Sequence, residues 1–221
     1  MRQSGPPSKD EIAAYENWLS LERSNRSNIA IPNELPWHSK AAVLELARYA
    51  TELQQERHAD NEVTNDGANV IVRLLTGSLT ACVYDENLCR EVERFLHDGG
   101  SVRIIVWNKE LGSTLHECQS RLLANPKVEV RLSGTCLFGD KMNHFIVVDN
   151  LGYRREAPHP YYPADDFTLT SPEIPAQICF NDEVGAAKMI AFFDGLWSRL
   201  PVINIPSGCG TAEAGEQLAF A

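Results

Sequence analysis

The stretch from Lys141 to Glu156 constrains the possible folds more than any other part of the chain. Residues 145–148 read Phe-Ile-Val-Val, an apolar and largely β-branched run that is typical of a buried central strand. Residues 149–152 read Asp-Asn-Leu-Gly and predict a turn, because Asp and Asn tolerate a positive φ and Gly can end a loop. Residues 153–156 are more polar and predict a returning strand. The stretch therefore predicts a β-hairpin.

Polar side chains of this hairpin are the first candidates for a functional site. His144 and Asp149 are expected at opposite ends of the apolar strand, and Arg154 and Arg155 on the returning strand. Histidine and arginine side chains can donate charge-assisted hydrogen bonds to an anionic ligand. The alternative is that His144 is a core histidine at a strand entrance and that Asp149 only holds the turn.

The segment before the hairpin alternates strands and helices. Apolar runs at 70–75, 102–107 and 127–132 predict strands, with helices between them that begin near Asp85 and Leu111. Two such strand–helix–strand units with right-handed crossovers give a parallel core sheet. Ligands bind beyond the carboxyl ends of parallel strands, so the loop at 76–78 makes Ser78 a candidate ligand-binding residue.

The predicted fold class is α/β: a mixed sheet flanked by helices on both faces, with an N-terminal helical extension. Residues 1–68 form the extension, 69–200 the α/β domain and 201–221 a loose tail. In the extension, the capping box Ser8-Lys9-Asp10-Glu11 opens a helix, and a second helix is predicted from Ser39 to about His58. Pro36 is expected to prevent helix around it. After the hairpin, strands are predicted at 167–170 and 176–180, and a helix from Asp182.

The hairpin resembles the signature strand of the phospholipase D-like superfamily. That signature is His-x-Lys, four further residues and Asp, within an apolar strand that is followed by a turn and a second strand. With Asp149 at the Asp position, Met142 stands at the position of the nucleophilic His and His144 at that of the Lys. The small residue pair that follows in the family falls near Arg155-Glu156. The end of the chain, a strand ending in Phe-Asn and a helix ending in Leu-Trp, also resembles this family.

The resemblance implies a phospholipase D-like fold with a degenerate active site. A methionine thioether has no basic nitrogen with which to attack phosphorus, so Met142 cannot form a phosphohistidine. The residues at the Lys and Asp positions of the motif, His144 and Asp149, are the candidate catalytic residues, and Ser78, His144, Arg154 and Arg155 are the candidate ligand-binding residues. Single-motif members of the superfamily pair two copies across a dimer, which implies a homodimer here.

Three functions stay open at this point. The first is a noncatalytic phospholipase D-like module that binds a protein partner or a phosphate-containing ligand. The second is a phosphodiesterase or nuclease that acts as a dimer through His144. The third is a structural or regulatory subunit whose only role is protein contact, for instance in a bacterial multi-gene system. Met142 favours the first over the second, and no catalytic activity is the expectation.

Composition limits the partners and cofactors. The chain has 221 residues and a net charge of −10, which argues against broad binding to nucleic acid or anionic membranes. The first seven residues contain no apolar signal region, which favours a cytoplasmic protein. The six cysteines include no Cys-x-x-Cys pair and are expected as buried, reduced thiols. His116 and Cys118 lack finger-like zinc spacing, so neither a metal nor a cofactor is predicted.

Overall fold

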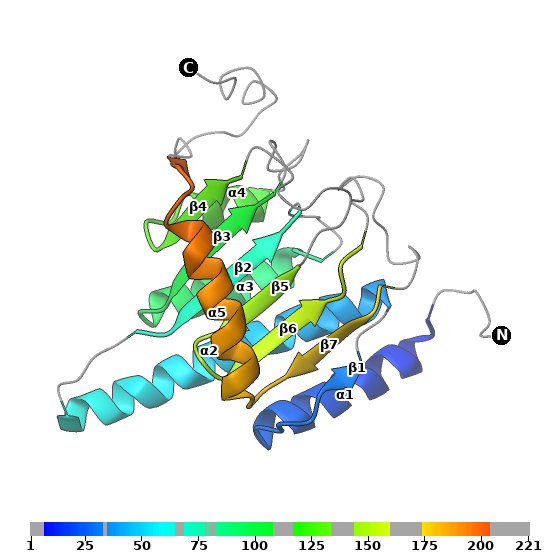
Figure 1. The fold of residues 1–221 in the computed structure, drawn as a ribbon. Helices are drawn as coiled ribbons and strands as arrows, with labels where there is room; N and C mark the ends of the chain where they lie inside the picture. Colours follow the sequence, from blue (N-terminus) through cyan, green and yellow to red (C-terminus); the bar gives the residue numbers. More distant parts are fainter. Residues whose placement is uncertain are drawn as a thin grey trace.

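The computed structural model describes residues 7–32, 35–64, 69–77, 79, 83–107, 117–133, 144–159 and 174–203. The predicted strand at 167–170 and the start of the helix predicted from Leu111 lie outside these residues. Within them, one mixed sheet has the strand order β1-β7-β6-β5-β2-β3-β4-β8 (Figure 1). The strands are β1 (Ile31–Pro32), β2 (Ile71–Thr76), β3 (Ser101–Val106), β4 (Val128–Leu132), β5 (Phe145–Val148), β6 (Gly152–Glu156), β7 (Ala176–Cys179) and β8 (Val202–Ile203). The helices are α1 (Lys9–Ser24), α2 (Pro36–Thr64), α3 (Glu86–His97), α4 (Glu117–Leu123) and α5 (Glu183–Trp197).

The centre of the sheet confirms the predicted topology. Strands β2, β3 and β4 are parallel, and β5 runs antiparallel to β2 and forms the hairpin with β6. Leu75 of β2 pairs with Phe145 of β5, so the carboxyl end of β2 lies next to the start of β5. This register places Thr76, the last residue of β2, near the start of β5, and Thr76 and His144 border the same cavity.

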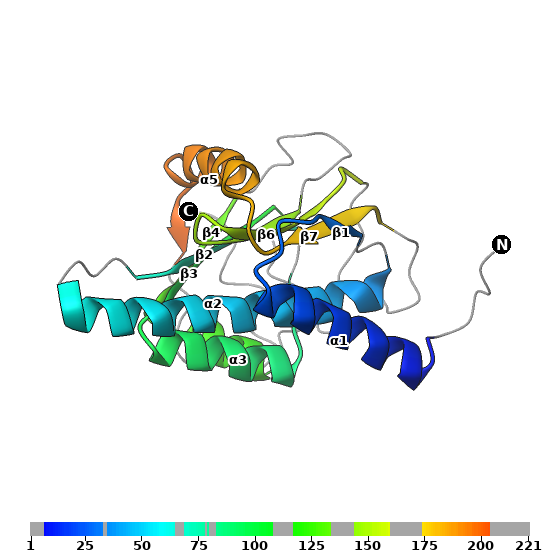
Figure 2. The ribbon, with the colours of Figure 1, turned by 90° about the horizontal axis from the view of Figure 1, so that it is seen from below.

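Helices cover both faces of the sheet, as predicted. Figure 2 shows α5 alone on one face and α1, α2 and α3 on the other. Side chains alternate between these two layers along each strand, because successive residues of a strand point to opposite faces. On β5, Ile146 and Val148 belong to the core under the helices α1–α3, whereas Phe145 and Val147 belong to the core under α5.

The segment before residue 69 belongs to the same packed core. The capping box predicted at Ser8–Glu11 is present, and Tyr15 and Leu19 of α1 are buried against the rest of the protein. Strand β1 pairs with β7 at one edge of the sheet. Much of the apolar face of α1 is therefore covered by other parts of the same chain, although Trp18 is 41% exposed. The predicted homodimer or partner chain stays a prediction.

Two predicted boundaries were wrong. Helix α2 begins at Pro36 and runs to Thr64, whereas a start at Ser39 and an end near His58 were predicted. Proline suits the first helical position, because its φ is already helical and its missing N–H has no partner there in any case. Residues 202–203, which were assigned to a loose tail, form β8 and pair with β4. That pairing places β8 on the side of β4 that faces away from β3.

A close approach of α2 to the hairpin requires a glycine at position 152. A methyl group on Gly152 would lie 2.8 Å from Cε1 of Tyr49, well inside van der Waals contact. Tyr49 is 1% exposed and packs edge-to-face against Phe180, with ring centroids 5.6 Å apart. The tyrosine ring therefore has no free space into which it can withdraw.

We predict that Gly152→Ala lowers the free energy of unfolding by about 1–3 kcal/mol, because overpacking forces buried side chains out of their rotamers. Gly195→Ala is the matched control. Position 195 is an exposed site in α5 where an added methyl group would have no atom within 4 Å, and the change should stabilise by about 0.5–1 kcal/mol. Urea unfolding of both variants measures the difference. Equal stability of Gly152→Ala and the wild type would contradict the packing described.

Candidate functional site

The candidate site lies where β5 begins and β6 ends. Arg154 and Glu156 are two residues apart on β6, so both side chains point to the face that α2 covers. His144 immediately precedes β5, and its carbonyl oxygen accepts a hydrogen bond from the backbone N–H of Glu156 (2.9 Å). His159 follows β6 and returns its ring to the same place, with its centroid 4.7 Å from that of His144.

The Glu156 carboxylate connects these side chains. Its Oε2 lies 3.2 Å from Nδ1 of His144 and 3.1 Å from Nε2 of His159, and its Oε1 lies 2.6 Å from Nη1 of Arg154. Arg154 also donates from Nη2 to the Ser39 hydroxyl at 2.6 Å, which ties the cluster to the start of α2. The Glu156 side chain is only 10% exposed. A buried carboxylate thus has a cation on one oxygen and two imidazoles on the other.

These contacts keep Glu156 ionised. Burial alone would raise the pKa of Glu156, but the charge of Arg154 and the hydrogen bonds from His144 and His159 outweigh it and hold the pKa well below its usual range. A charged carboxylate accepts hydrogen bonds and cannot donate them. Both ring nitrogens that face Oε2 must therefore carry their protons.

His144 has one ring nitrogen fixed and the other available. Its Nδ1 faces Glu156, and its Nε2 is buried without a hydrogen-bond partner among the described residues. A buried polar atom without a hydrogen-bond partner lowers the stability of the fold by about 1–3 kcal/mol. The presence of such an atom in His144 therefore points to a role other than stabilising the fold. His144 borders a cavity of about 70 Å³, whose other polar lining residues include Ser39, Thr76 and Tyr84.

His144 and Glu156 also border a larger groove, on the side of α5. This groove has a volume of about 490 Å³. The cations that line this groove are Arg155 and Lys188, and both are exposed. The Gln177 side-chain amide is oriented so that its oxygen accepts hydrogen bonds from Nε and Nη2 of Arg155, at 2.8 and 3.0 Å. The apolar part of the lining is contributed by Phe145, Pro158, Pro175, Met189 and Phe192.

The structure separates residues that the sequence analysis placed together. Arg154 and Arg155 point to opposite faces of β6, because neighbouring residues of a strand alternate, so they cannot serve one pocket in the same way. Asp149 lies at the far end of β5 from His144. It has a φ of +52° in the turn and forms an ion pair with Arg57 of α2, which is a structural role. The candidates Ser78 and Met142 lie outside the described residues.

Sequence reasoning missed Glu156 and His159. Glu156 appeared only as a departure from the family pattern. The sequence places His159 in a Pro-rich loop, which could cover the pocket or be a plain surface loop, and His159 was not among the predicted site residues. The two-residue spacing of Arg154 and Glu156 on a strand is a signal that places both on one face. Nothing in the spacing of His159 predicted its return to His144, because that depends on the path of the chain after β6.

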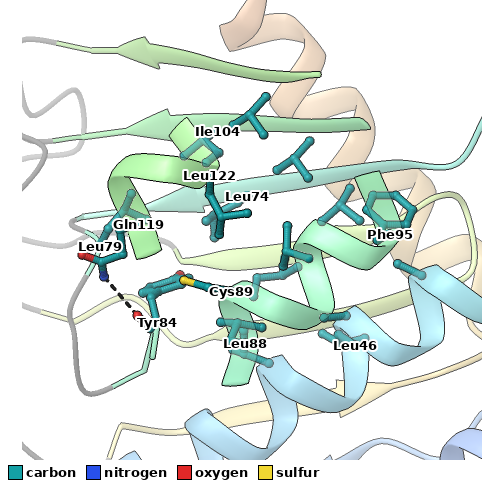
Figure 3. Close-up of a pocket in the computed structure, with 18 of the residues that line it drawn as sticks. Leu46, Leu74, Leu79, Tyr84, Leu88, Cys89, Phe95, Ile104, Gln119 and Leu122 are labelled. Carbon is teal, nitrogen blue, oxygen red and sulfur yellow. Dashed lines mark hydrogen bonds between the residues drawn. The ribbon is translucent and has the colours of Figure 1, made fainter. Parts of the chain in front are cut away.

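A further cavity, between the sheet and helices α2, α3 and α4, is part of the core. It has a volume of about 90 Å³ and an almost wholly apolar lining (Figure 3). Its polar member Gln119 donates to the Tyr84 carbonyl oxygen at 3.2 Å. Cys89 borders it as a free, buried cysteine, and burial together with the adjacent Cys118 raises the pKa of its thiol. This cavity offers no charged group to a ligand. The described cysteines Cys89, Cys118 and Cys179 confirm the prediction of buried, reduced thiols.

Comparison with solved structures decides the fold. NucT from Helicobacter pylori superposes with a TM-score of 0.53 at 12% sequence identity, over 79% of this chain and 99% of that chain. Nuc from Salmonella typhimurium, a phospholipase D family member, gives a TM-score of 0.45 at 16% identity, over 67% and 91%. The chain has a phospholipase D-like fold, which it shares with NucT.

The phospholipase D-like fold is therefore established from structure, not from sequence. No protein-family model and no curated protein sequence matches the chain. None of the described helices has the length and apolar character to cross a membrane. In the hairpin, the residue that directly precedes β5 and borders the cavity is His144.

We predict that Glu156→Gln lowers the free energy of unfolding at neutral pH by about 3 kcal/mol, because it leaves Arg154 buried without its counter-charge. The pKa of Glu156 is lower in the folded than in the unfolded chain, so its contribution is present above about pH 4.5 and is lost as the pH falls through the folded-state pKa. Urea unfolding between neutral and acidic pH should show the gap between wild type and variant narrowing.

Glu56→Gln is the matched control for this prediction. Glu56 pairs with Arg26, and the two side chains are 52% and 43% exposed. An exposed pair of this kind contributes about 0–1 kcal/mol, so the control should unfold nearly as the wild type does. If the two substitutions had equal effects, the Glu156 carboxylate would not have the organising role described.

Proposed function

We propose that this phospholipase D-like domain binds a phosphate-containing ligand at His144 without hydrolysing it. The observation that carries the proposal is the state of the His144 ring: Nδ1 is held by a buried carboxylate, and Nε2 is buried beside a cavity without a partner among the described residues. A phosphate oxygen at Nε2 would satisfy this ring nitrogen. It would also form a charge-assisted hydrogen bond.

Protonation of His144 makes this interaction self-consistent. A phosphate oxygen is an acceptor, so Nε2 must carry a proton when the ligand binds. Because Nδ1 already carries the proton that faces Glu156, the bound ring is an imidazolium between two anions.

The adjoining groove suits a phosphate ester with an apolar substituent. Arg155 and Lys188 place two cations near the mouth of the site, and Phe145, Met189 and Phe192 supply an apolar wall. The net charge of −10 repels long polyanions, whereas a single phosphate group needs only the local cations. This combination favours a small phosphoester over a nucleic-acid strand.

Hydrolysis through His144 is the second candidate, because one observation favours it. A neutral imidazole with Nδ1–H directed at a carboxylate has its lone pair on Nε2, which is the arrangement of a histidine base or nucleophile. Against it stands Met142, which the resemblance places at the position of the family nucleophile. The two candidates differ in whether a phosphorus–oxygen bond breaks.

We predict that bis-p-nitrophenyl phosphate, an aryl phosphodiester, binds the wild type and is not hydrolysed. Isothermal titration calorimetry should show His144→Ala weakening the binding by about 10-fold or more, the range of one hydrogen bond between charged groups. His97→Ala, at an 89% exposed histidine, is the matched control and should bind as the wild type does. Unchanged affinity in His144→Ala would rule out the proposed site.

The same compound separates binding from hydrolysis, because cleavage releases coloured p-nitrophenolate. We predict no release above the uncatalysed rate. Release that persists through purification and disappears in His144→Ala would overturn the noncatalytic proposal in favour of the phosphodiesterase.

A further inference from the structure

We infer that His144, Glu156 and His159 form a binding site for a divalent transition-metal ion, with zinc as the best match. Two imidazoles and one carboxylate are a ligand set that binds zinc through three protein ligands. One nitrogen or oxygen atom from each of the three residues lies within 4.8 Å of the others. No motif in the sequence indicates this site, since two of its ligands come from the end of β6 and the residues after it, and the third precedes β5.

The spacing of the ligand atoms fits one ion. Nδ1 of His144 and Nε2 of His159 lie 3.2 and 3.1 Å from the same Glu156 oxygen. Zinc–nitrogen and zinc–oxygen bonds are about 2.0–2.2 Å long, so two ligand atoms on one tetrahedral ion are separated by about 3.3–3.5 Å. Each of these two nitrogens therefore needs to move only a few tenths of an ångström away from the Glu156 oxygen to reach the spacing of ligands on one ion.

The surroundings hold the ligands in place. Arg154 binds the other Glu156 oxygen at 2.6 Å and is itself fixed by Ser39, so the carboxylate presents Oε2 to the two imidazoles. Partners of this kind orient ligating carboxylates in metal sites. The side chains of His144, Glu156 and His159 are 20%, 10% and 11% exposed, which shelters the ion but keeps the site next to the groove.

Charge predicts what completes the coordination. Arg154 and Glu156 cancel, and two neutral imidazoles add nothing, so a bound zinc ion leaves a net charge of about +2 in a sheltered site. Three protein ligands leave a position for water or an anionic oxygen. A phosphate oxygen would both fill that position and lower the charge. This last step rests on the proposed phosphate-binding function, whereas the metal site does not.

Metal binding would also fix the chemistry of His144. With zinc on Nδ1, the single remaining ring proton resides on Nε2, which makes that nitrogen a donor to phosphate and removes its lone pair. A zinc-loaded protein would therefore bind phosphate without taking up a proton. The metal would favour ligand binding and prevent His144 from acting as a nucleophile.

Titration of the EDTA-treated full chain with zinc(II) alone, followed by isothermal titration calorimetry, tests the site. We expect the wild type to bind one zinc ion per chain. The zinc affinity should fall at least about 100-fold in His159→Gln, because loss of a direct ligand weakens metal binding more than loss of a residue that only hydrogen-bonds to a ligand. His97→Ala should bind as the wild type does. Circular dichroism and urea unfolding of His159→Gln establish that the variant is folded.

Cobalt(II) as a substitute for zinc distinguishes this site from the cysteines. Histidine and carboxylate ligands should give visible d–d bands without the thiolate-to-cobalt charge-transfer band in the near ultraviolet. Absence of binding by the wild type, a thiolate band, or unchanged affinity in His159→Gln would each overturn the inference. Binding of bis-p-nitrophenyl phosphate to the EDTA-treated protein tests the proposed function separately, so failure of one leaves the other standing.

Discussion

The buried carboxylate of Glu156 is the interaction on which the candidate site depends. It accepts from Arg154 on one oxygen and faces His144 and His159 on the other, so a single group sets the position of three side chains. Burial of an unpaired carboxylate would be strongly unfavourable, and the guanidinium and imidazoles remove that penalty. The same contacts leave Nε2 of His144 without a partner among the described residues. The feature that points to a ligand is thus a consequence of how Glu156 is stabilised.

The hairpin places this carboxylate. Antiparallel pairing of β5 and β6 brings residues 144 and 156 together, and the alternation of β6 sends Arg154 and Glu156 towards α2 while Arg155 faces the opposite layer. At the other end, the turn at Asp149 is fixed by Arg57, and Gly152 admits the ring of Tyr49. One end of the hairpin is therefore structural and the other carries the chemistry. This division explains why Asp149, a motif residue, lies away from the site.

Local patterns predicted most of the fold. Apolar runs and capping residues indicated the central strands and helices α1, α3 and α5, because each depends on neighbours in the sequence. The start of α2 at Pro36 and the pairing of β8 with β4 were missed, since proline at a first helical position and a short edge pairing depend on tertiary context. His144 was predicted as a site residue from the motif. Its partners Glu156 and His159 were not, because no rule of spacing predicts two imidazoles on one carboxylate oxygen.

A crystal structure of the EDTA-treated protein soaked in inorganic phosphate tests the central claim most directly. The account predicts a phosphate oxygen within hydrogen-bond distance of Nε2 of His144 while Nδ1 remains on Glu156. Such a result would show that the carboxylate positions the ring and that the ring binds the ligand. A phosphate held only by Arg155 and Lys188, or a His144 ring turned away from Glu156, would contradict it.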